Sequence, residues 1–188
     1  MKLLHLDSSI LGDNSVSRQL SAQIVAKLKA ANPTAEVTYH DLAANPLPHI
    51  TLAEFATAES KQLLAEFKEA DVVVIGTPMY NFGISSQLKA WIDRVAVAGE
   101  TFKYTETGPV GLMGSKRVII AASNGGYYHA QNAAGASMNH QTAYLKSVLA
   151  FMGIMNPEII AAEGMMVGPD AKAAGMAAAE AEITKLAA

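Results

Sequence analysis

Serine hydroxyls gather in one segment near the start of the chain, and this segment leads directly into a helical pattern. Residues 7–17 include Ser8, Ser9, Ser15 and Ser17 and contain no lysine. Helix N-termini bind phosphate through free backbone N–H groups and a partial positive charge, and hydroxyls add further donors. Because neither a G-x-G-x-x-G motif nor a P-loop lysine is present, we expect a phosphate loop of neutral donors. The alternative is an ordinary serine-rich turn in which Ser17 is a helix N-cap.

A second candidate loop follows the most apolar run of the chain and carries bulky side chains. Met79, Tyr80 and Phe82 are large and apolar where solvated residues are expected, which indicates a partner surface. The flat isoalloxazine ring of a flavin would be such a partner, and the alternative is that these side chains pack onto the core of the domain. Asn81 with Gly83 permits unusual backbone angles and a close approach to a ligand edge.

A third candidate loop, residues 123–128, contains two adjacent glycines. Gly125 and Gly126 would let backbone amides come close to a ligand, where they could stabilise negative charge on a reduced flavin. The alternative is a simple turn, since Asn-Gly is a strong turn signal. Each loop alone has an ordinary explanation, but together the three favour a mononucleotide site.

The elements that must position these loops alternate between strands and helices. Apolar runs without alternation predict buried strands at 3–6, 71–76, 117–122 and 157–161, and a weak alternation predicts one more at 36–40. Apolar residues at helical spacing predict helices over 20–28, 52–70, 84–95, 145–152 and 171–188. This order predicts an α/β fold, a doubly wound five-stranded parallel sheet with helices on both faces. Ligands of such sheets bind beyond the carboxyl ends of the strands, where the three loops begin.

Composition narrows the function classes. A chain of 188 residues suits one domain spanning 1–188, and the net charge of −3 without a basic cluster argues against a nucleic-acid partner. The chain has no cysteine, so disulfides and thiolate chemistry are excluded, and we expect no metal site. The first apolar run ends at Asp7, too early for a signal peptide, and no run is long enough to cross a membrane. We therefore expect a cytoplasmic protein.

Six short motifs are distributed along the chain in a specific order. They are S-S-I-L at 8–11, S-V-S at 15–17, P-M-Y-N-F at 78–82, Q-L-K at 87–89, T-F-K-Y-T-E at 101–106 followed by G-P at 108–109, and G-G at 125–126. Together they resemble the FMN-dependent NADH-azoreductases, which are also described as NADH:quinone oxidoreductases. The resemblance extends over nearly the whole chain, from Lys2 through 162–164.

The resemblance implies a flavodoxin-like fold, a homodimer and FMN held without a covalent bond. It implies phosphate contacts from Ser9, Ser15, Val16 and Ser17. It implies contacts with the flavin ring from Met79, Tyr80, Asn81, Phe82, Ser123, Asn124, Gly125 and Gly126. Two departures stand out, because the family usually has arginine where this chain has Asn124, and the stretch 42–58 is shorter than the family pattern.

We infer ping-pong electron transfer through FMN, because one flavin face in one pocket leaves little space for donor and acceptor to stack together. NADH, or NADPH, gives hydride to the flavin and leaves, and a quinone or azo compound then takes the electrons. No side chain is assigned as a catalytic acid; His129 and His140 are either proton donors or surface residues, and His5 is expected to be a satisfied core histidine. The alternative is a flavodoxin-like electron carrier without small-molecule turnover. Such carriers rely on a strongly charged face, which a net charge of −3 does not favour.

Overall fold

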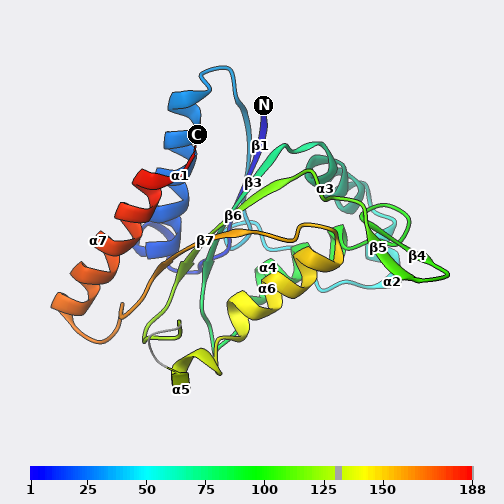
Figure 1. The fold of residues 1–188 in the computed structure, drawn as a ribbon. Coiled ribbons are helices and arrows are strands. Elements are labelled where there is room, and N and C mark those ends of the chain that lie inside the picture. Colours follow the sequence, from blue (N-terminus) through cyan, green and yellow to red (C-terminus); the bar gives the residue numbers. More distant parts are fainter. Residues whose placement is uncertain (130–132, 188) are drawn as a thin grey trace.

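A five-stranded parallel sheet forms the centre of the molecule in this computed structural model, which describes residues 1–129 and 133–187 (Figure 1). The strands are β1 (Lys2–Asp7), β2 (Glu36–Asp41), β3 (Val72–Pro78), β6 (Arg117–Ser123) and β7 (Glu158–Ala162). Their order is β2-β1-β3-β6-β7, and every neighbouring pair is parallel. The predicted sheet is confirmed, and the direction in which strands are added reverses between β1 and β3.

Helices cover both faces of the sheet (Figure 1). One face carries α1 (Val16–Ala31) and α7 (Pro169–Lys185), and the other carries α3 (Ala58–Glu69), α4 (Ser86–Val95) and α6 (His140–Phe151). Neighbouring residues of a strand point to opposite faces of the sheet. Leu3 packs on the face covered by α1 and α7, and Leu4 packs on the face covered by α3, α4 and α6. Burial on both faces explains why strand sequences such as 72–75 are apolar throughout.

The helix predicted over 52–70 is interrupted. Its residues form a short helix, α2 (Leu52–Phe55), and the longer α3. The Thr57 hydroxyl accepts a hydrogen bond from the backbone N–H of Ser60 at 3.2 Å and so caps a new helix start. The exposed position of Leu52 also breaks the expected apolar face, since 92% of its surface is accessible.

A small antiparallel hairpin lies outside the main sheet and was not predicted. It consists of β4 (Phe102–Thr105) and β5 (Gly108–Gly111). The Phe102 ring lies 4.4 Å from the ring of Phe151 at the end of α6, measured between centroids. Gly153 follows α6 with a φ of +97°, the left-handed conformation in which helices commonly end at glycine.

Two further short helical elements precede the longer helices α1 and α6. A 3-10 turn, η1 (Gly12–Asn14), precedes α1, and α5 (Ala133–Ala136) precedes α6. No helix in residues 1–129 or 133–187 is both long and apolar enough to cross a bilayer.

Candidate flavin site

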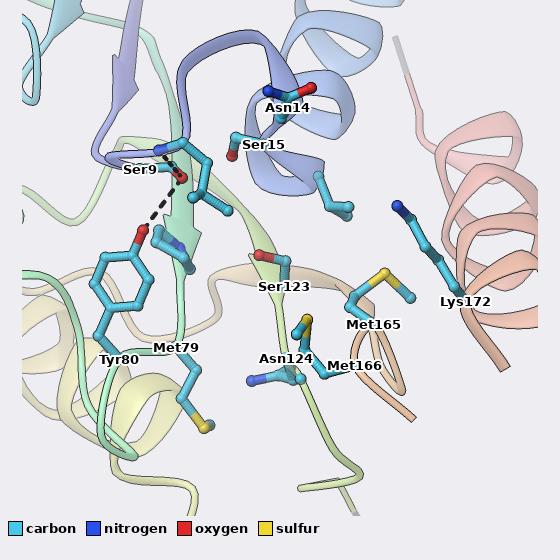
Figure 2. Close-up of a pocket in the computed structure, with 14 residues that line it drawn as sticks. Ser9, Asn14, Ser15, Met79, Tyr80, Ser123, Asn124, Met165, Met166 and Lys172 are labelled. Atoms are coloured by element: carbon cyan, nitrogen blue, oxygen red, sulfur yellow. Dashed lines mark hydrogen bonds between the residues drawn. The ribbon is translucent and has the colours of Figure 1, made fainter. Parts of the chain in front are cut away.

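A cavity of about 270 Å³ opens at the carboxyl ends of the strands, where the three candidate loops meet (Figure 2). It lies at the β1–β3 switch point, which is where open α/β sheets bind their ligands. Its described lining residues are Ser9, Leu11, Asn14, Ser15, Val16, Pro78, Met79, Tyr80, Ser123, Asn124, Gly125, Met165, Met166 and Lys172. One wall is therefore rich in hydroxyl and amide groups, and another is apolar.

The first loop presents the start of α1 to the cavity. Ser15, and not Ser17, is the N-cap residue, and its hydroxyl accepts a hydrogen bond from the N–H of Arg18 at 3.3 Å. The Ser17 hydroxyl lies buried 3.1 Å from that of Ser15. The N–H groups of Val16 and Ser17 belong to the first helical turn, so they have no acceptor within the helix. This end of the cavity is suited to a phosphate group.

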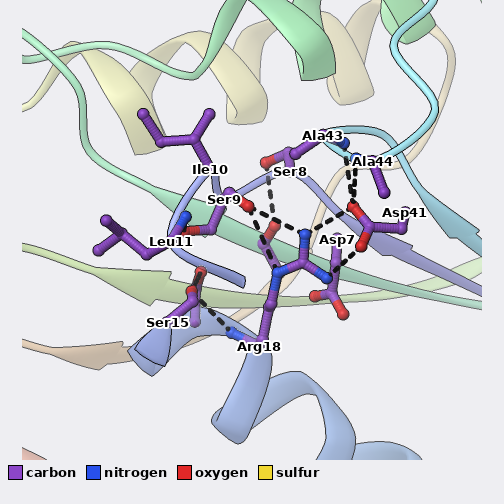
Figure 3. A network of polar contacts seen from close by, with 12 residues as sticks. Asp7, Ser8, Ser9, Ile10, Leu11, Ser15, Arg18, Asp41, Ala43 and Ala44 are labelled. Atoms are coloured by element: carbon purple, nitrogen blue, oxygen red, sulfur yellow. Dashed lines mark hydrogen bonds and ion pairs between the residues drawn. The ribbon is translucent and has the colours of Figure 1, made fainter. Parts of the chain in front are cut away.

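Arg18 fixes the first loop in place but has no free charge to offer (Figure 3). Its guanidinium binds the Asp41 carboxylate through two hydrogen bonds of 2.5 and 2.6 Å. It also donates to the carbonyl of Ser9 at 2.9 and 3.3 Å. The hydrogen bonding between Arg18 and Asp41 raises the pKa of Arg18 and lowers the pKa of Asp41. Both groups are therefore ionised, and their charges neutralise each other.

A second polar group supports the loop from within the sheet. The buried Asp7 carboxylate accepts hydrogen bonds from the hydroxyls of Ser21 at 2.7 Å and Tyr39 at 3.2 Å. Burial, with the negative charge of Asp7 close by, raises the pKa of Tyr39 to about 12. Gly76 leaves room for Asp7, because a Cβ atom there would stand 2.1 Å from its Oδ1. His5 Nε2 lies 2.9 Å from Ser21 Oγ, which confirms His5 as a satisfied core histidine.

The second loop is connected to the first by a tyrosine. The Tyr80 hydroxyl accepts a hydrogen bond from the N–H of Ile10 at 3.2 Å. Asn81 and Phe82 then adopt left-handed backbone conformations, with φ of 48° and 70°, before the chain pairs Gly83 back with Tyr80. The unusual angles expected at Asn81 are confirmed, but the second such residue is Phe82 and not Gly83. Two adjacent non-glycine residues in this region store strain, a feature common at ligand sites.

The third loop is held by a relay of buried amides. Gln141, at the start of α6, donates from Nε2 to the carbonyl of Thr77 at 3.0 Å, and its Oε1 accepts from Asn124 Nδ2 at 3.1 Å. A backbone carbonyl only accepts, so the direction of both side-chain amides is determined. Asn124 is fully buried and neutral at the position where the resemblance implies arginine. It therefore joins this loop to β3 and α6.

Comparison with known proteins agrees with this geometry. The model of the flavodoxin-like fold family matches residues 1–187. An FMN-dependent NADH:quinone oxidoreductase of Xanthomonas campestris pv. campestris is 52% identical, over 99% of this chain and 99% of its own. The enzyme of that name from Azospirillum brasilense is also 52% identical, over 100% of this chain and 98% of its own.

This chain belongs to the FMN-dependent NADH:quinone oxidoreductase family. Solved structures support the assignment. The azoreductase AzrA superposes with a TM-score of 0.89 at 31% identity, covering 98% of both chains. An FMN-dependent NADH-azoreductase of Bacillus anthracis, solved in complex with FMN, gives a TM-score of 0.86 at 27% identity, covering 100% of this chain and 99% of that one.

The cavity contains most of the positions implied by the family resemblance. Those that line it are Ser9, Ser15, Val16, Met79, Tyr80, Ser123, Asn124 and Gly125. Those that do not line it are Ser17, Asn81, Phe82 and Gly126. The Phe82 ring instead meets the Tyr128 ring edge-on, with 6.0 Å between centroids. Neither His129, which lies 3.0 Å from a carboxylate oxygen of Glu163, nor His140 lines the cavity.

The C-terminal part of the chain also contributes to the cavity, which the sequence motifs did not predict. Met165 and Met166 follow β7, and Lys172 extends from the first turns of α7 (Figure 2). No local motif distinguishes them. Only the topology could have indicated their position, because β7 ends at the same edge of the sheet as β1, β3 and β6.

Proposed function

We propose that this chain is an FMN-dependent NADH:quinone oxidoreductase formed by a single domain over residues 1–188, which also reduces azo compounds. The observation that carries the proposal is the single cavity that joins the start of α1 to the apolar side chains of Met79 and Tyr80. Hydrogen-bond donors at one end suit a phosphate, and apolar surface at the other suits a flat ring. The phosphate is held by Ser9, Ser15, Val16 and Ser17, and the ring by residues 79–82 and 123–126.

The residues present fit FMN in two respects. The phosphate end has free donors and the hydroxyl of Ser15, as the neutral loop requires. Gly125 leaves backbone accessible at the cavity wall, where a Cβ atom would stand 3.2 Å from the Met166 side chain. At about 270 Å³, the cavity lies just below the roughly 300–1,000 Å³ typical of ligand sites, so part of the flavin needs cover from elsewhere.

Bound FMN supplies the redox chemistry, in which NADH, a proton and a quinone become NAD⁺ and a hydroquinone. The residues of this chain bind and orient the reactants. Met79 and Tyr80 would provide apolar surface beside the ring, and the absence of a side chain at Gly125 would let the backbone approach it. NADPH is the alternative donor. We assign no side chain as a catalytic acid.

The absorption spectrum of the purified protein tests this proposal. We expect a yellow protein that releases FMN and not FAD, and that oxidises NADH in the presence of a quinone. A colourless protein that remains unsaturated when FMN is titrated in would refute the proposal. FMN binding without steady-state NADH oxidation would instead indicate the electron carrier.

The proposal includes a homodimer and a cytoplasmic location, the latter in keeping with a chain that has no cysteine. Large apolar side chains near the cavity and on the hairpin are exposed, including Met166 at 86%, Tyr104 at 73% and Phe82 at 38%. A second copy could cover such surface and complete the flavin site. Light scattering at micromolar concentration should report twice the mass of one chain. An active monomer would contradict this part of the proposal.

A further inference from the structure

One lysine lines the flavin cavity without an assigned role. Lys172 is the only charged side chain among the cavity's described lining residues. Figure 2 shows it extending from α7 toward the side of the cavity where α1 begins. The side chain is exposed, and within residues 1–129 and 133–187 no hydrogen bond or ion pair engages its ammonium group. Its charge is therefore available to a ligand.

The packing of α7 against α1 determines which end of the cavity Lys172 faces. Two hydrogen bonds connect the helices, Gln23 Nε2 to Glu180 Oε1 at 3.4 Å and Lys27 Nζ to the carbonyl of Thr184 at 2.5 Å. Both join residues that are 157 positions apart, so the helices run parallel and in constant register. Continued to the starts of the two helices, this register brings Lys172 level with Ser15, the N-cap of α1, and both residues line the cavity. Lys172 thus stands beside the phosphate end.

The phosphate end otherwise lacks a full positive charge. Its donors are hydroxyls and backbone N–H groups, and a helix N-terminus contributes only about half an elementary charge. Arg18, the nearest other cation of the loop, is neutralised by Asp41. A phosphate monoester carries a charge of about −1.5 to −2 at neutral pH. A full positive charge beside these donors would further stabilise the phosphate, and Lys172 is in position to supply it.

We propose that Lys172 is a further FMN-binding residue, which neutralises the cofactor phosphate from the α7 side. The inference rests on the proposed function and extends it. Sequence reasoning predicted a phosphate site of neutral donors only. The site instead combines a neutral loop from the start of the chain with a cation from its last helix. The charge favours FMN over riboflavin, which has the same ring and no phosphate.

Flavin affinity tests this assignment without depending on turnover. The flavin-free full-length protein is titrated with FMN and with riboflavin, each at low and high salt, and the quenching of flavin fluorescence is followed. For Lys172→Gln we expect FMN affinity to fall about three- to ten-fold, as for a partly exposed ionic contact, with riboflavin affinity unchanged. The salt dependence of FMN binding should shrink as well, and Lys172→Arg should restore most of the affinity.

A matched control lies on the same helix. Lys185 is near the end of α7 and pairs with Glu182 at 2.7 Å, so Lys185→Gln should leave both flavin affinities unchanged. Unchanged FMN affinity in Lys172→Gln would overturn the inference, and so would an equal loss for both flavins. A raised KM for NADH with unchanged FMN affinity would also overturn it, because the charge would then serve the donor. A wild-type protein that binds neither flavin would instead refute the proposed function.

Discussion

Individual buried polar residues determine the shape of the site. The amide relay from Thr77 through Gln141 to Asn124 joins the end of β3, the start of α6 and the third loop. Both amide side chains are fully buried, so neither can exchange its partner for water. The relay therefore stabilises the loop only while all its members are present.

Gln141→Leu should lower the free energy of unfolding by about 1–3 kcal/mol, because the Thr77 carbonyl and the Asn124 amide would each lose a buried partner. Urea denaturation of the flavin-free protein measures this change. Gln62→Leu is the control, since Gln62 is exposed on α3 and donates only to Glu66. Its effect should stay within about 0.5 kcal/mol. Equal effects of the two substitutions would show that the relay contributes nothing specific.

The ion pair of Arg18 and Asp41 makes stability depend on pH. Arg18 holds the pKa of Asp41 below its ordinary value of 3.8, so the ionised carboxylate stabilises the fold above about pH 4. That contribution is lost as the pH falls through the lowered pKa of Asp41. In Asp41→Asn, thermal unfolding between pH 3 and 7 should show a smaller loss of Tm on acidification than in the wild type.

Asp13→Asn is the control for stability, since Asp13 is exposed and forms no ion pair within the described residues. If Asp41→Asn and the wild type lose Tm in parallel on acidification, the ion pair does not contribute to the acid response.

At the scale of elements, the hairpin is attached to α6 through two glycines. Gly153 ends α6 with a φ of +97°, and its Cβ, if it had one, would stand 3.1 Å from the Gly111 carbonyl carbon. A Cβ on Gly111 would in turn stand 2.0 Å from the Gly153 nitrogen. Backbone therefore packs directly on backbone at this contact, which only glycine permits.

Gly153→Ala should lower the free energy of unfolding by more than the roughly 1–2 kcal/mol of left-handed strain alone, because the new methyl group also displaces β5. Gly99→Ala separates the two causes. Gly99 has a φ of +83° and open space around its Cβ position, so it should show the strain alone. Equilibrium denaturation of both variants is the measurement. A cost for Gly153→Ala no greater than that for Gly99→Ala would mean that β5 shifts freely.

Buried strands were predictable from sequence because both faces of the sheet are covered, which leaves apolar runs such as 72–75 without alternation. The break before α3 was not predictable, because the helical pattern of the sequence continues through Thr57, which caps the start of α3. The hairpin was missed because only Phe102 among the residues of β4 is buried. A largely exposed strand pair has no hydrophobic period to detect.

The site was predictable where one loop contains several donors or aromatic groups, as at 8–17 and 78–82. Four implied contacts do not line the cavity, and two of them, Asn81 and Phe82, have left-handed backbone conformations. Lys172 could not be found from local sequence. Its place depends on the register between two helices that are more than a hundred residues apart in the chain.

At the scale of the whole molecule, a single cavity must serve both substrates. The cavity is lined by residues of all three loops, and a flavin held there with one ring face exposed would accept one aromatic partner at a time. We therefore expect ping-pong kinetics. Initial rates with varied NADH at several fixed quinone concentrations should give parallel double-reciprocal lines. Intersecting lines would mean that donor and acceptor bind together, and would contradict the shared cavity even with FMN in place.

The cavity combines residues 9–16 with residues 165–172, two segments from opposite ends of the chain. During synthesis residues 9–16 leave the ribosome more than a hundred residues before α7. A nascent chain can form β1, α1 and β3 and still lack one wall of the site. A complete cavity therefore requires α7 to be docked, so flavin retention would report the docking of this helix.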